Sequence, residues 1–240
     1  MRIGDYLVPT TVDWPGKCAM IIWTAGCNFR CPFCQNSGII PMDSGSEITV
    51  DKMEDKIGEN LMWIDGVVFS GGEPTLQEEP LTDLASFIKS KGKGVLIDTN
   101  GSNPDVLDRM LGEGLVDRVS IDLKAAPQRY KEVAGVPGKV ADRVLESLEL
   151  SLNSDAFVEV RTTVVPGLVG PKDIERISPL IARCDVYYLQ QFRPEGDLLD
   201  ESLAEREPPL PNKLSRLARI AKKHVNKVGI KTKEFGIQYL

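Results

Sequence analysis

Short apolar runs alternate with longer amphipathic stretches along most of the chain. The apolar runs are fewer than ten residues long, as is typical of buried strands, and the stretches between them repeat their apolar positions every three to four residues, as helices do. This alternation predicts βα units on a parallel sheet. Strands are predicted at residues 18–24, 66–69, 94–98, 118–123, 157–165 and 186–191, and helices at residues 50–63, 81–91, 104–111, 140–152, 172–182 and 213–225.

The six predicted units occupy residues 17–194, which gives each unit about thirty residues, the size of a βαβ building block. A closed barrel of eight units typically needs about 250 residues, more than these six units supply. The predicted fold class is therefore α/β, an incomplete (β/α)6 barrel of the TIM-like kind. No Pro/Gly/Ser-rich linker or block of charge divides the sequence, so residues 1–240 are expected to form a single domain, with residues 195–240 as a C-terminal helix and tail.

The composition limits the compartment and the partners. Hydrophobic residues make up 42% of the chain and charged residues 27%, as in ordinary soluble proteins. The longest apolar run, residues 19–23, is too short to cross a bilayer, and the N-terminus lacks the apolar stretch of a signal peptide. We therefore expect a cytoplasmic protein that binds no membrane. Because the net charge is −6 and the one basic region, residues 222–233, fits a solvated helix face followed by an edge strand, DNA is not an expected partner.

Three of the five cysteines are clustered directly after the first predicted strand. Cys27, Cys31 and Cys34 stand in Cys-Asn-Phe-Arg-Cys-Pro-Phe-Cys, with three residues in the first gap and two in the second. Each iron of a four-iron cluster normally takes one cysteine thiolate. Three thiolates therefore leave one iron open to bind a small molecule, which indicates chemistry rather than electron storage.

Other interpretations of these cysteines remain open from the residues alone. A structural zinc site needs four closed ligands, and no second Cys or His pair lies nearby. A disulfide with a spare thiol, or three unrelated buried cysteines, would also fit the composition. Cys18 and Cys184 fit no metal-ligand spacing and are predicted to be inert packing residues.

Polar and glycine-rich segments follow the second, third and fourth predicted strands. They are Gly71-Gly72-Glu73-Pro74, Asp98-Thr99-Asn100-Gly101 and Asp122-Leu123-Lys124. Parallel barrels place their active sites at these strand ends, and period-two alternation sends Ser120, Asp122 and Lys124 to one face, predicted to be the interior. Buried charges are costly unless they are paired or bind an ion. A ligand site is therefore expected at this rim, although Glu73 would also fit an ordinary surface turn.

The cysteine motif resembles that of the radical S-adenosylmethionine (SAM) superfamily. The resemblance implies that the open iron is chelated by the amino and carboxylate groups of SAM. It also implies that Gly71, Gly72 and Glu73 lie at the amino group of SAM, and that Phe33, between the last two cysteines, lies near the adenine or shields the cluster.

The segments at the third and fourth strands resemble those of the glycyl-radical-enzyme activases, of the pyruvate formate-lyase and anaerobic ribonucleotide reductase types. The resemblance implies that Asp98, Thr99 and Asp122 help to hold a monovalent cation beside the carboxylate of SAM. Asn100 belongs to the same cofactor-binding segment, and Lys124 matches a lysine near SAM.

Two further positions carry weaker matches. Arg161, in the fifth predicted strand, matches an arginine beside SAM, although a salt bridge to Glu159 or another carboxylate is the alternative. Gln191 stands where the family often has a histidine that reaches the ribose. Trp14 departs from the family pattern Asp-Gly-Pro-Gly, because the chain has Asp-Trp-Pro-Gly there.

The resemblance implies an oxidoreductase that cleaves SAM reductively at a 4Fe–4S cluster and generates a 5′-deoxyadenosyl radical, which abstracts hydrogen from a glycine of a partner glycyl-radical enzyme. A flavodoxin or ferredoxin-like protein is expected to supply the electron. One alternative is a radical SAM enzyme for a small molecule or modified nucleoside, similar to 7-carboxy-7-deazaguanine synthases, although those have a longer gap between their first two cysteines. A non-catalytic iron–sulfur electron carrier is the alternative from another class.

Overall fold

The computed structural model describes residues 1–240 and contains one continuous ten-stranded sheet in the order β10-β9-β8-β7-β6-β5-β4-β2-β1-β3. Seven neighbouring strands run parallel, from β2 to β9, and β1 and β10 are antiparallel to their neighbours. The strands are β1 (Arg2–Thr10), β2 (Ala19–Thr24), β3 (Ser46–Glu47), β4 (Gly66–Gly71), β5 (Gly94–Thr99), β6 (Arg118–Asp122), β7 (Phe157–Val164), β8 (Val186–Gln191), β9 (Val228–Thr232) and β10 (Gly236–Tyr239).

All six predicted strands are present, as β2 and β4 to β8, and the predicted α/β fold class is confirmed. The prediction of an edge strand in the basic region was wrong, because β9 is a seventh parallel strand that pairs on both sides and β10 forms the edge. Strand β1 was not predicted. The sheet remains open, with β3 at one edge and β10 at the other.

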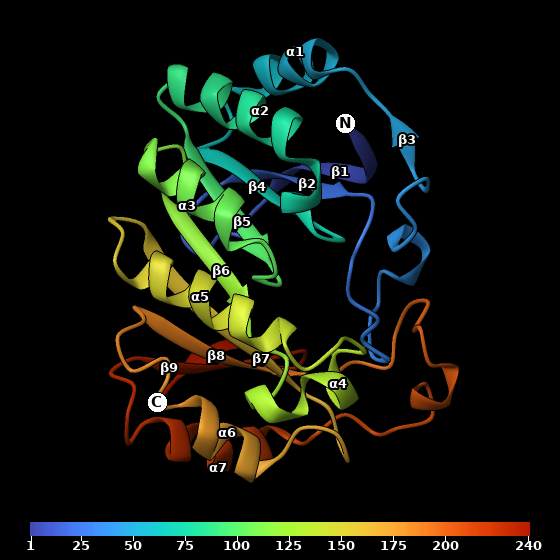
Figure 1. The fold of residues 1–240 in the computed structure, drawn as a ribbon, viewed down its shortest axis with the longest axis vertical. Helices are drawn as coiled ribbons and strands as arrows, with labels where there is room; N and C mark the ends of the chain where they lie inside the picture. Colours follow the sequence, from blue (N-terminus) through green and yellow to red (C-terminus); the bar gives the residue numbers. More distant parts are fainter.

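The helices follow one another around the outside of the curved sheet (Figure 1). Helix α1 begins where the hydroxyl of Thr49 accepts a hydrogen bond from the backbone of Lys52, and it buries Met53 and Ile57. Such amphipathic helices cover the outer face of the strands. The helices are α1 (Val50–Asn60), α2 (Glu78–Ser90), α3 (Pro104–Gly112), α4 (Tyr130–Val133), α5 (Val140–Leu152), α6 (Pro171–Ile177) and α7 (Pro211–Ala221).

The other face of the sheet carries a small apolar cluster at the N-terminal ends of the strands. It consists of Trp14, Ala19, Ile21, Val68 and Leu96. The indole of Trp14 lies against the backbone of β4 and β5, where a Cβ on either of their first glycines would stand 2.7 Å from the ring. Trp14, the residue that departs from the family pattern, therefore fills this end of the sheet interior with an apolar side chain. The polar segments predicted to form a site lie at the opposite, C-terminal ends of the strands.

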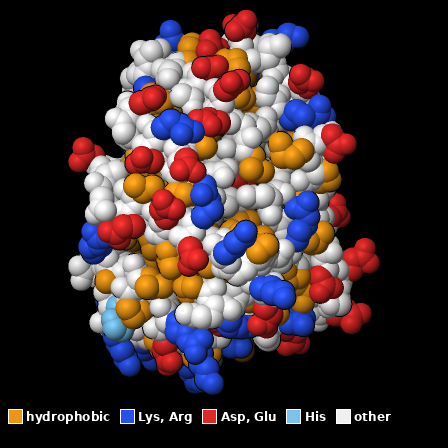
Figure 2. Space-filling model, viewed as in Figure 1, with side chains coloured by type: hydrophobic (Ala, Val, Ile, Leu, Met, Phe, Trp, Pro, Cys, Tyr) orange, Lys and Arg blue, Asp and Glu red, His pale blue; other side chains and the backbone are white.

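Charged side chains are distributed unevenly over the surface. Figure 2 shows acidic and basic side chains interspersed over the upper part of one face, with lysine and arginine gathered at its lower end beside the histidine. The exposed residues Lys222, Lys223 and His224 follow α7 there. None of the helices has the length and apolar character that a bilayer-spanning segment requires.

Candidate active site

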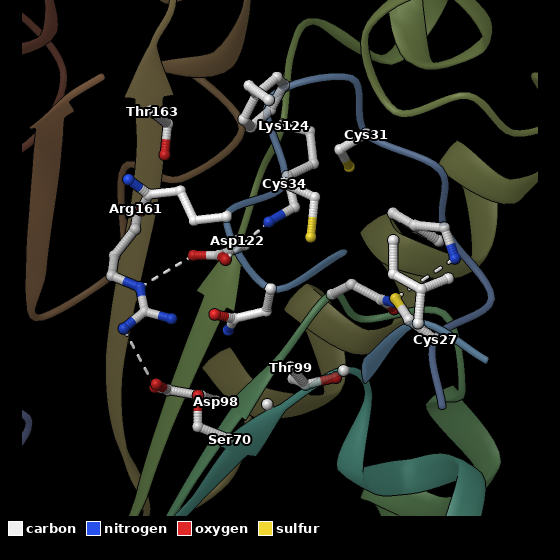
Figure 3. Close-up of a pocket in the computed structure, with 18 of the residues that line it drawn as sticks. Cys27, Cys31, Cys34, Ser70, Asp98, Thr99, Asp122, Lys124, Arg161 and Thr163 are labelled. Carbon is white, nitrogen blue, oxygen red and sulfur yellow. Dashed lines mark hydrogen bonds and ion pairs between the residues drawn. The ribbon is translucent and has the colours of Figure 1, made fainter. Parts of the chain in front are cut away.

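A pocket of about 240 Å³ lies at the C-terminal ends of β4 to β8. The cysteine loop forms one wall and the strand ends form the other, and Figure 3 shows side chains from both converging on the space between them. Twelve of the fourteen predicted site residues line this pocket, namely Cys27, Cys31, Phe33, Cys34, Gly71, Gly72, Asp98, Thr99, Asn100, Asp122, Lys124 and Arg161. The structure therefore brings together segments that lie more than a hundred residues apart in the sequence.

The cysteine loop is held by backbone hydrogen bonds to three distant segments. The amide of Cys27 donates to the carbonyl of Ile40 at 2.9 Å, and the amide of Arg30 donates to the carbonyl of Ala134 at 3.0 Å. On the remaining side, the carbonyl of Cys34 accepts from the amide of Leu199 at 3.2 Å. The three thiols are thus presented to the pocket by a loop whose ends are fixed before any ligand binds.

The thiols themselves suit a cluster better than a single metal ion. None of the five cysteines forms a disulfide, and no three His, Cys, Asp or Glu side chains lie close enough together to hold one metal ion. In a four-iron cluster each thiolate binds a different iron, so the sulfur atoms need only face one cavity. The residues therefore fit a cluster and argue against the zinc alternative.

Burial controls the protonation of these thiols. It raises the pKa of Cys27 above its ordinary value and raises the pKa of Cys31 to about 12, with the ammonium of Lys124 opposing the latter shift. Because thiolates are the metal ligands, cluster assembly must release protons from this loop. The positive charge of Lys124 lowers the cost of that step.

The glycine pair Gly71-Gly72, at the end of β4, allows two backbones to pack against each other. A Cβ on Gly72 would overlap the carbonyl oxygen of Gly26, which precedes the first cysteine. The amide of Gly72 donates to the carbonyl of Thr24, and the amide of Glu73 donates to the carbonyl of Gly26, both at 2.8 Å. Glycine is required here because any side chain would push the two loops apart.

Glu73 does not line the pocket but lies buried beneath it. Its carboxylate accepts hydrogen bonds from the hydroxyl of Thr75 at 2.6 Å and the hydroxyl of Thr99 at 2.8 Å. It also accepts from the backbone amides of Thr75, at 3.2 Å, and Asn100, at 2.7 Å. Burial raises the pKa of Glu73, and these hydrogen bonds oppose the shift. Glu73 therefore joins the ends of β4 and β5 through these hydrogen bonds. The position of its side chain gives no support to the predicted contact with SAM.

Four charged residues form what we call the rim network, consisting of Asp98, Asp122, Lys124 and Arg161. The guanidinium of Arg161 lies 3.1 Å from a carboxylate oxygen of Asp98 and 2.8 Å from one of Asp122. The ammonium of Lys124 lies 2.7 Å from the other oxygen of Asp122 (Figure 3). Two carboxylates and two cations therefore balance within the network.

The rim network fixes the charge state of its members. Burial alone would raise the pKa of Asp122, but Arg161 and Lys124 outweigh burial and hold that pKa well below its usual range. Burial raises the pKa of Asp98 despite Arg161. The buried Oδ1 of Asp98 lies 3.1 Å from the guanidinium of Arg161 but accepts no well-aligned hydrogen bond. Arg161 stands between the two aspartates that were predicted to share a monovalent cation, and it supplies positive charge at that point.

A second group of charges lies four residues earlier on β6 and two residues earlier on β7, and it extends to β9. We call it the lower network, consisting of Arg118, Glu159 and Lys231. Glu159 is paired with Arg118, and its other oxygen lies 2.9 Å from the ammonium of Lys231. Burial opposes ionisation of Glu159, but the neighbouring cations hold its pKa below the usual range. The alternative for Arg161, a salt bridge to Glu159 or another carboxylate, is therefore confirmed in its second form, since Arg161 pairs with Asp98 and Asp122.

Gln191 lies outside the pocket. Its amide donates to the carbonyl of Pro209 at 3.1 Å, and its oxygen accepts from the amide of Lys233 at 2.8 Å, so the side chain ties β8 to the C-terminal segment. The preceding residue, Gln190, lines the pocket instead, together with Thr163 of β7. Gln190 therefore replaces Gln191 as the better-placed candidate for a ribose contact.

Sequence reasoning missed Ser70, Thr163 and Gln190 as pocket residues. Each stands on the strand face shared by Asp98, Asp122 and Arg161. Period-two alternation extended along β4, β7 and β8 would have identified all three. The cysteine loop and the residues after it also contribute pocket residues that were not predicted, namely Phe29, Gln35, Asn36 and Ile40, and nothing in their spacing distinguishes them from ordinary loop residues.

Comparison with known proteins places the chain in a family. Residues 21–177 match the family model of the radical SAM superfamily. A Methanocaldococcus jannaschii protein, provisionally named a glycyl-radical enzyme activating enzyme, is 36% identical over 226 residues, which cover 93% of this chain and 92% of that protein. The pyruvate formate-lyase 1-activating enzyme of Escherichia coli K12 is 32% identical over 174 residues, with 69% and 68% covered.

Solved structures share the fold at low sequence identity. A structure of TYW1 with a lysine-pyruvate adduct aligns with a TM-score of 0.64 at 17% identity and covers 91% of this chain and 77% of its own. SuiB from Streptococcus suis, bound to S-adenosylmethionine, aligns with a TM-score of 0.65 at 14% identity, with 87% and 48% covered. These likenesses concern the architecture of the chain.

Proposed function

The chain belongs to the radical SAM superfamily and, within it, to the glycyl-radical enzyme activating enzymes, and we propose that its substrate is a glycine residue of a partner glycyl-radical enzyme. When bound, the 4Fe–4S cluster of this family supplies the electron that cleaves SAM to a 5′-deoxyadenosyl radical. The observation that carries the proposal is a single pocket lined by the three cysteines, the glycine pair and the rim network. Neither the small-molecule alternative nor the electron-carrier alternative is favoured.

The residues of the chain divide the work of binding. The three cysteines hold the cluster, and the backbone of Gly71 and Gly72 allows SAM to approach closely. Lys124 and Arg161 offer cations to the carboxylate of SAM, while Asp98, whose Oδ1 is ion-paired with Arg161 without a well-aligned hydrogen bond, offers its carboxylate to the amino group of SAM. Charge-assisted hydrogen bonds of this kind are the strong ones, so the rim network is the main determinant of how SAM is oriented.

An acidic one-electron carrier, a flavodoxin or ferredoxin-like protein, is the proposed reductant. The exposed Arg30 donates hydrogen bonds to the carbonyl of the cluster ligand Cys27 at 2.7 Å and to that of Phe29 at 2.8 Å. Lys131 and Lys139 are exposed on the segment that pairs with Arg30, and none of these three cations pairs with a carboxylate. Charge complementarity favours an acidic donor at this surface.

The donor surface has its own test. Arg30→Gln should slow reduction of the cluster by photoreduced flavodoxin several-fold at low salt, because the docking surface loses an unpaired cation next to a cluster ligand. Lys222→Gln, which removes an exposed cation after α7, is the matched control and should leave the rate unchanged. Equal rates for Arg30→Gln and wild type would place the donor elsewhere.

The proposed function is tested with anaerobically reconstituted protein. With dithionite and SAM it should form 5′-deoxyadenosine, and with a glycyl-radical enzyme from the same genome it should produce a glycyl radical detectable by electron paramagnetic resonance. Cys31→Ala should abolish both signals. SAM cleavage without a glycyl radical, tried with partners of the pyruvate formate-lyase and the ribonucleotide reductase types, would contradict the proposed substrate.

A further inference from the structure

The side chain of Asn100 points at the sulfur atom of the first cysteine. Its Nδ2 lies 4.0 Å from the Sγ of Cys27 and 2.9 Å from the Oδ1 of Asn28. The backbone amide of Phe29 approaches the same sulfur at 3.4 Å. Cys27 therefore has two N–H groups directed at its sulfur, one from its own loop and one from the end of β5.

The orientation of the Asn100 amide is fixed by its other hydrogen bonds. Its Oδ1 accepts from the backbone amide of Ser102 at 2.9 Å, so the nitrogen must face Cys27 and Asn28. The hydroxyl of Ser102 accepts from the Nδ2 of Asn28 at 2.8 Å, which closes the ring of contacts. Buried amides of this kind have one arrangement that satisfies all their partners.

The backbone of Asn100 is anchored as well. Its amide donates to the buried carboxylate of Glu73 at 2.7 Å, and only 6% of Asn100 is exposed. The Gly-Gly-Glu-Pro segment thus holds the residue that contacts the cysteine loop. This connection gives the buried Glu73 an indirect role, because it sets the distance between Asn100 and Cys27.

We propose that Asn100 is a positioning residue that donates a hydrogen bond to the Cys27 thiolate and thereby raises the reduction potential of the cluster. Hydrogen bonds to the sulfur atoms are among the features that set the potentials of iron–sulfur clusters. An N–H donor stabilises the more negative, reduced state and so favours its formation. The inference rests on the proposed function only in taking Cys27 as a cluster ligand, and it assigns Asn100 to the cluster rather than to SAM.

The test is a redox titration of the reconstituted protein, followed by electron paramagnetic resonance without SAM. Asn100→Asp keeps an acceptor for Ser102 but replaces the donor at Cys27 with a carboxylate oxygen. We expect the ratio of reduced to oxidised cluster at a fixed potential to fall about tenfold, which corresponds to about 59 mV for one electron. Asn100→Ser, which is neutral and too short to reach the sulfur, should shift the ratio in the same direction by a smaller factor.

Asn28→Asp is the matched control. It adds the same charge beside Asn100 but retains an acceptor for the Asn100 amide, so the donor to Cys27 stays in place and the shift should be clearly smaller. Equal shifts for Asn28→Asp and Asn100→Asp would show that charge alone acts and would overturn the proposal. An unchanged potential in Asn100→Ser at full iron content would also overturn it. If wild-type protein assembles no cluster, the proposed function fails instead, so the two failures are distinguishable.

Discussion

The rim network and the lower network occupy the same face of β6 and β7, yet their surroundings differ. The rim network lines the pocket, balances two carboxylates with two cations, and keeps one carboxylate oxygen without a well-aligned partner. The lower network surrounds the single carboxylate of Glu159, which is 2% exposed, with two cations that use both of its oxygens. The rim network therefore faces a space in which a ligand can bind, whereas the lower network directs its carboxylate fully to the protein.

The difference shows how one sheet interior serves two purposes. Glu159 joins β6, β7 and β9 through Arg118 and Lys231, and so holds the open end of the sheet in register. Asp122, four residues after Arg118 on the same strand, joins Arg161 and Lys124 at the pocket instead. Removing one partner of a buried ion pair leaves an uncompensated charge, so the two networks should respond to substitution in different ways.

The largest effect is expected from Glu159→Gln. The buried Arg118 and the half-buried Lys231 would then be left with no carboxylate, and breaking a buried ion pair typically costs about 3–5 kcal/mol. Urea unfolding monitored by circular dichroism should show this loss, with unchanged iron content under folding conditions. A loss below about 1 kcal/mol would mean that the lower network does not stabilise the sheet.

The same network predicts a dependence on acid. The folded-state pKa of Glu159 is held below its ordinary value of 4.5, so its stabilising contribution is fully present above about pH 4.5. It is lost as the pH falls below 4.5 through the lower folded-state value. The difference in unfolding free energy between wild type and Glu159→Gln should therefore shrink with acid, and a constant difference from pH 6 to pH 3 would contradict the assignment.

Much of the fold followed from local patterns. The parallel strands were predictable because their apolar runs are buried on both faces, and the cysteine spacing identified the loop after β2. Strand β1 was missed because Gly4, Asp5 and Pro9 interrupt its run and its support comes from pairing with β2. The formation of β1 therefore depends on contacts with a segment distant in the sequence, which local patterns do not show.

The site was predictable in its members but less so in its geometry. Sequence reasoning placed Asp122 and Lys124 on one face, and the structure agrees. It could not show that Glu73 turns away from the pocket, because a carboxylate after a glycine pair can face either side of its turn. Gln191 was predicted as the ribose contact in place of its neighbour Gln190. Successive residues of a strand point to opposite faces of the sheet, so an error of one residue places the side chain on the wrong face.

Packing at the glycine pair should have a smaller effect on stability than the lower network, but a specific effect on the pocket. Gly72→Ala forces the loop after β4 away from the carbonyl of Gly26, and overpacking of this kind costs about 1–3 kcal/mol. Gly38→Ala is the matched control, because a Cβ there would meet nothing within 4 Å. SAM titrations of the reduced protein should show weaker binding only for Gly72→Ala, and equal behaviour of the two variants would contradict the close contact.

Asp122→Asn compares the rim network with the lower network directly. It removes the carboxylate that orients both Arg161 and Lys124, so SAM affinity should fall about tenfold, or about 1.4 kcal/mol. Because the side chain of Asp122 is 27% exposed, the unfolding free energy should change less than in Glu159→Gln. The prediction fails if Asp122→Asn loses as much stability as Glu159→Gln while binding SAM normally.

The smallest effect is expected from exchanging potassium for lithium at constant ionic strength. The resemblance to the activases implied a monovalent cation at Asp98 and Asp122, and two carboxylates near the carboxylate of SAM do require positive charge between them. Arg161 contacts both aspartates and Lys124 contacts one of them, so the protein already supplies that charge. Wild-type SAM cleavage should then change by less than about twofold between the two salts, whereas Arg161→Met should become sensitive to the choice of cation because it leaves Asp98 unpaired. A strong preference for potassium in the wild type would show instead that a bound cation, and not Arg161, neutralises the rim when SAM is present.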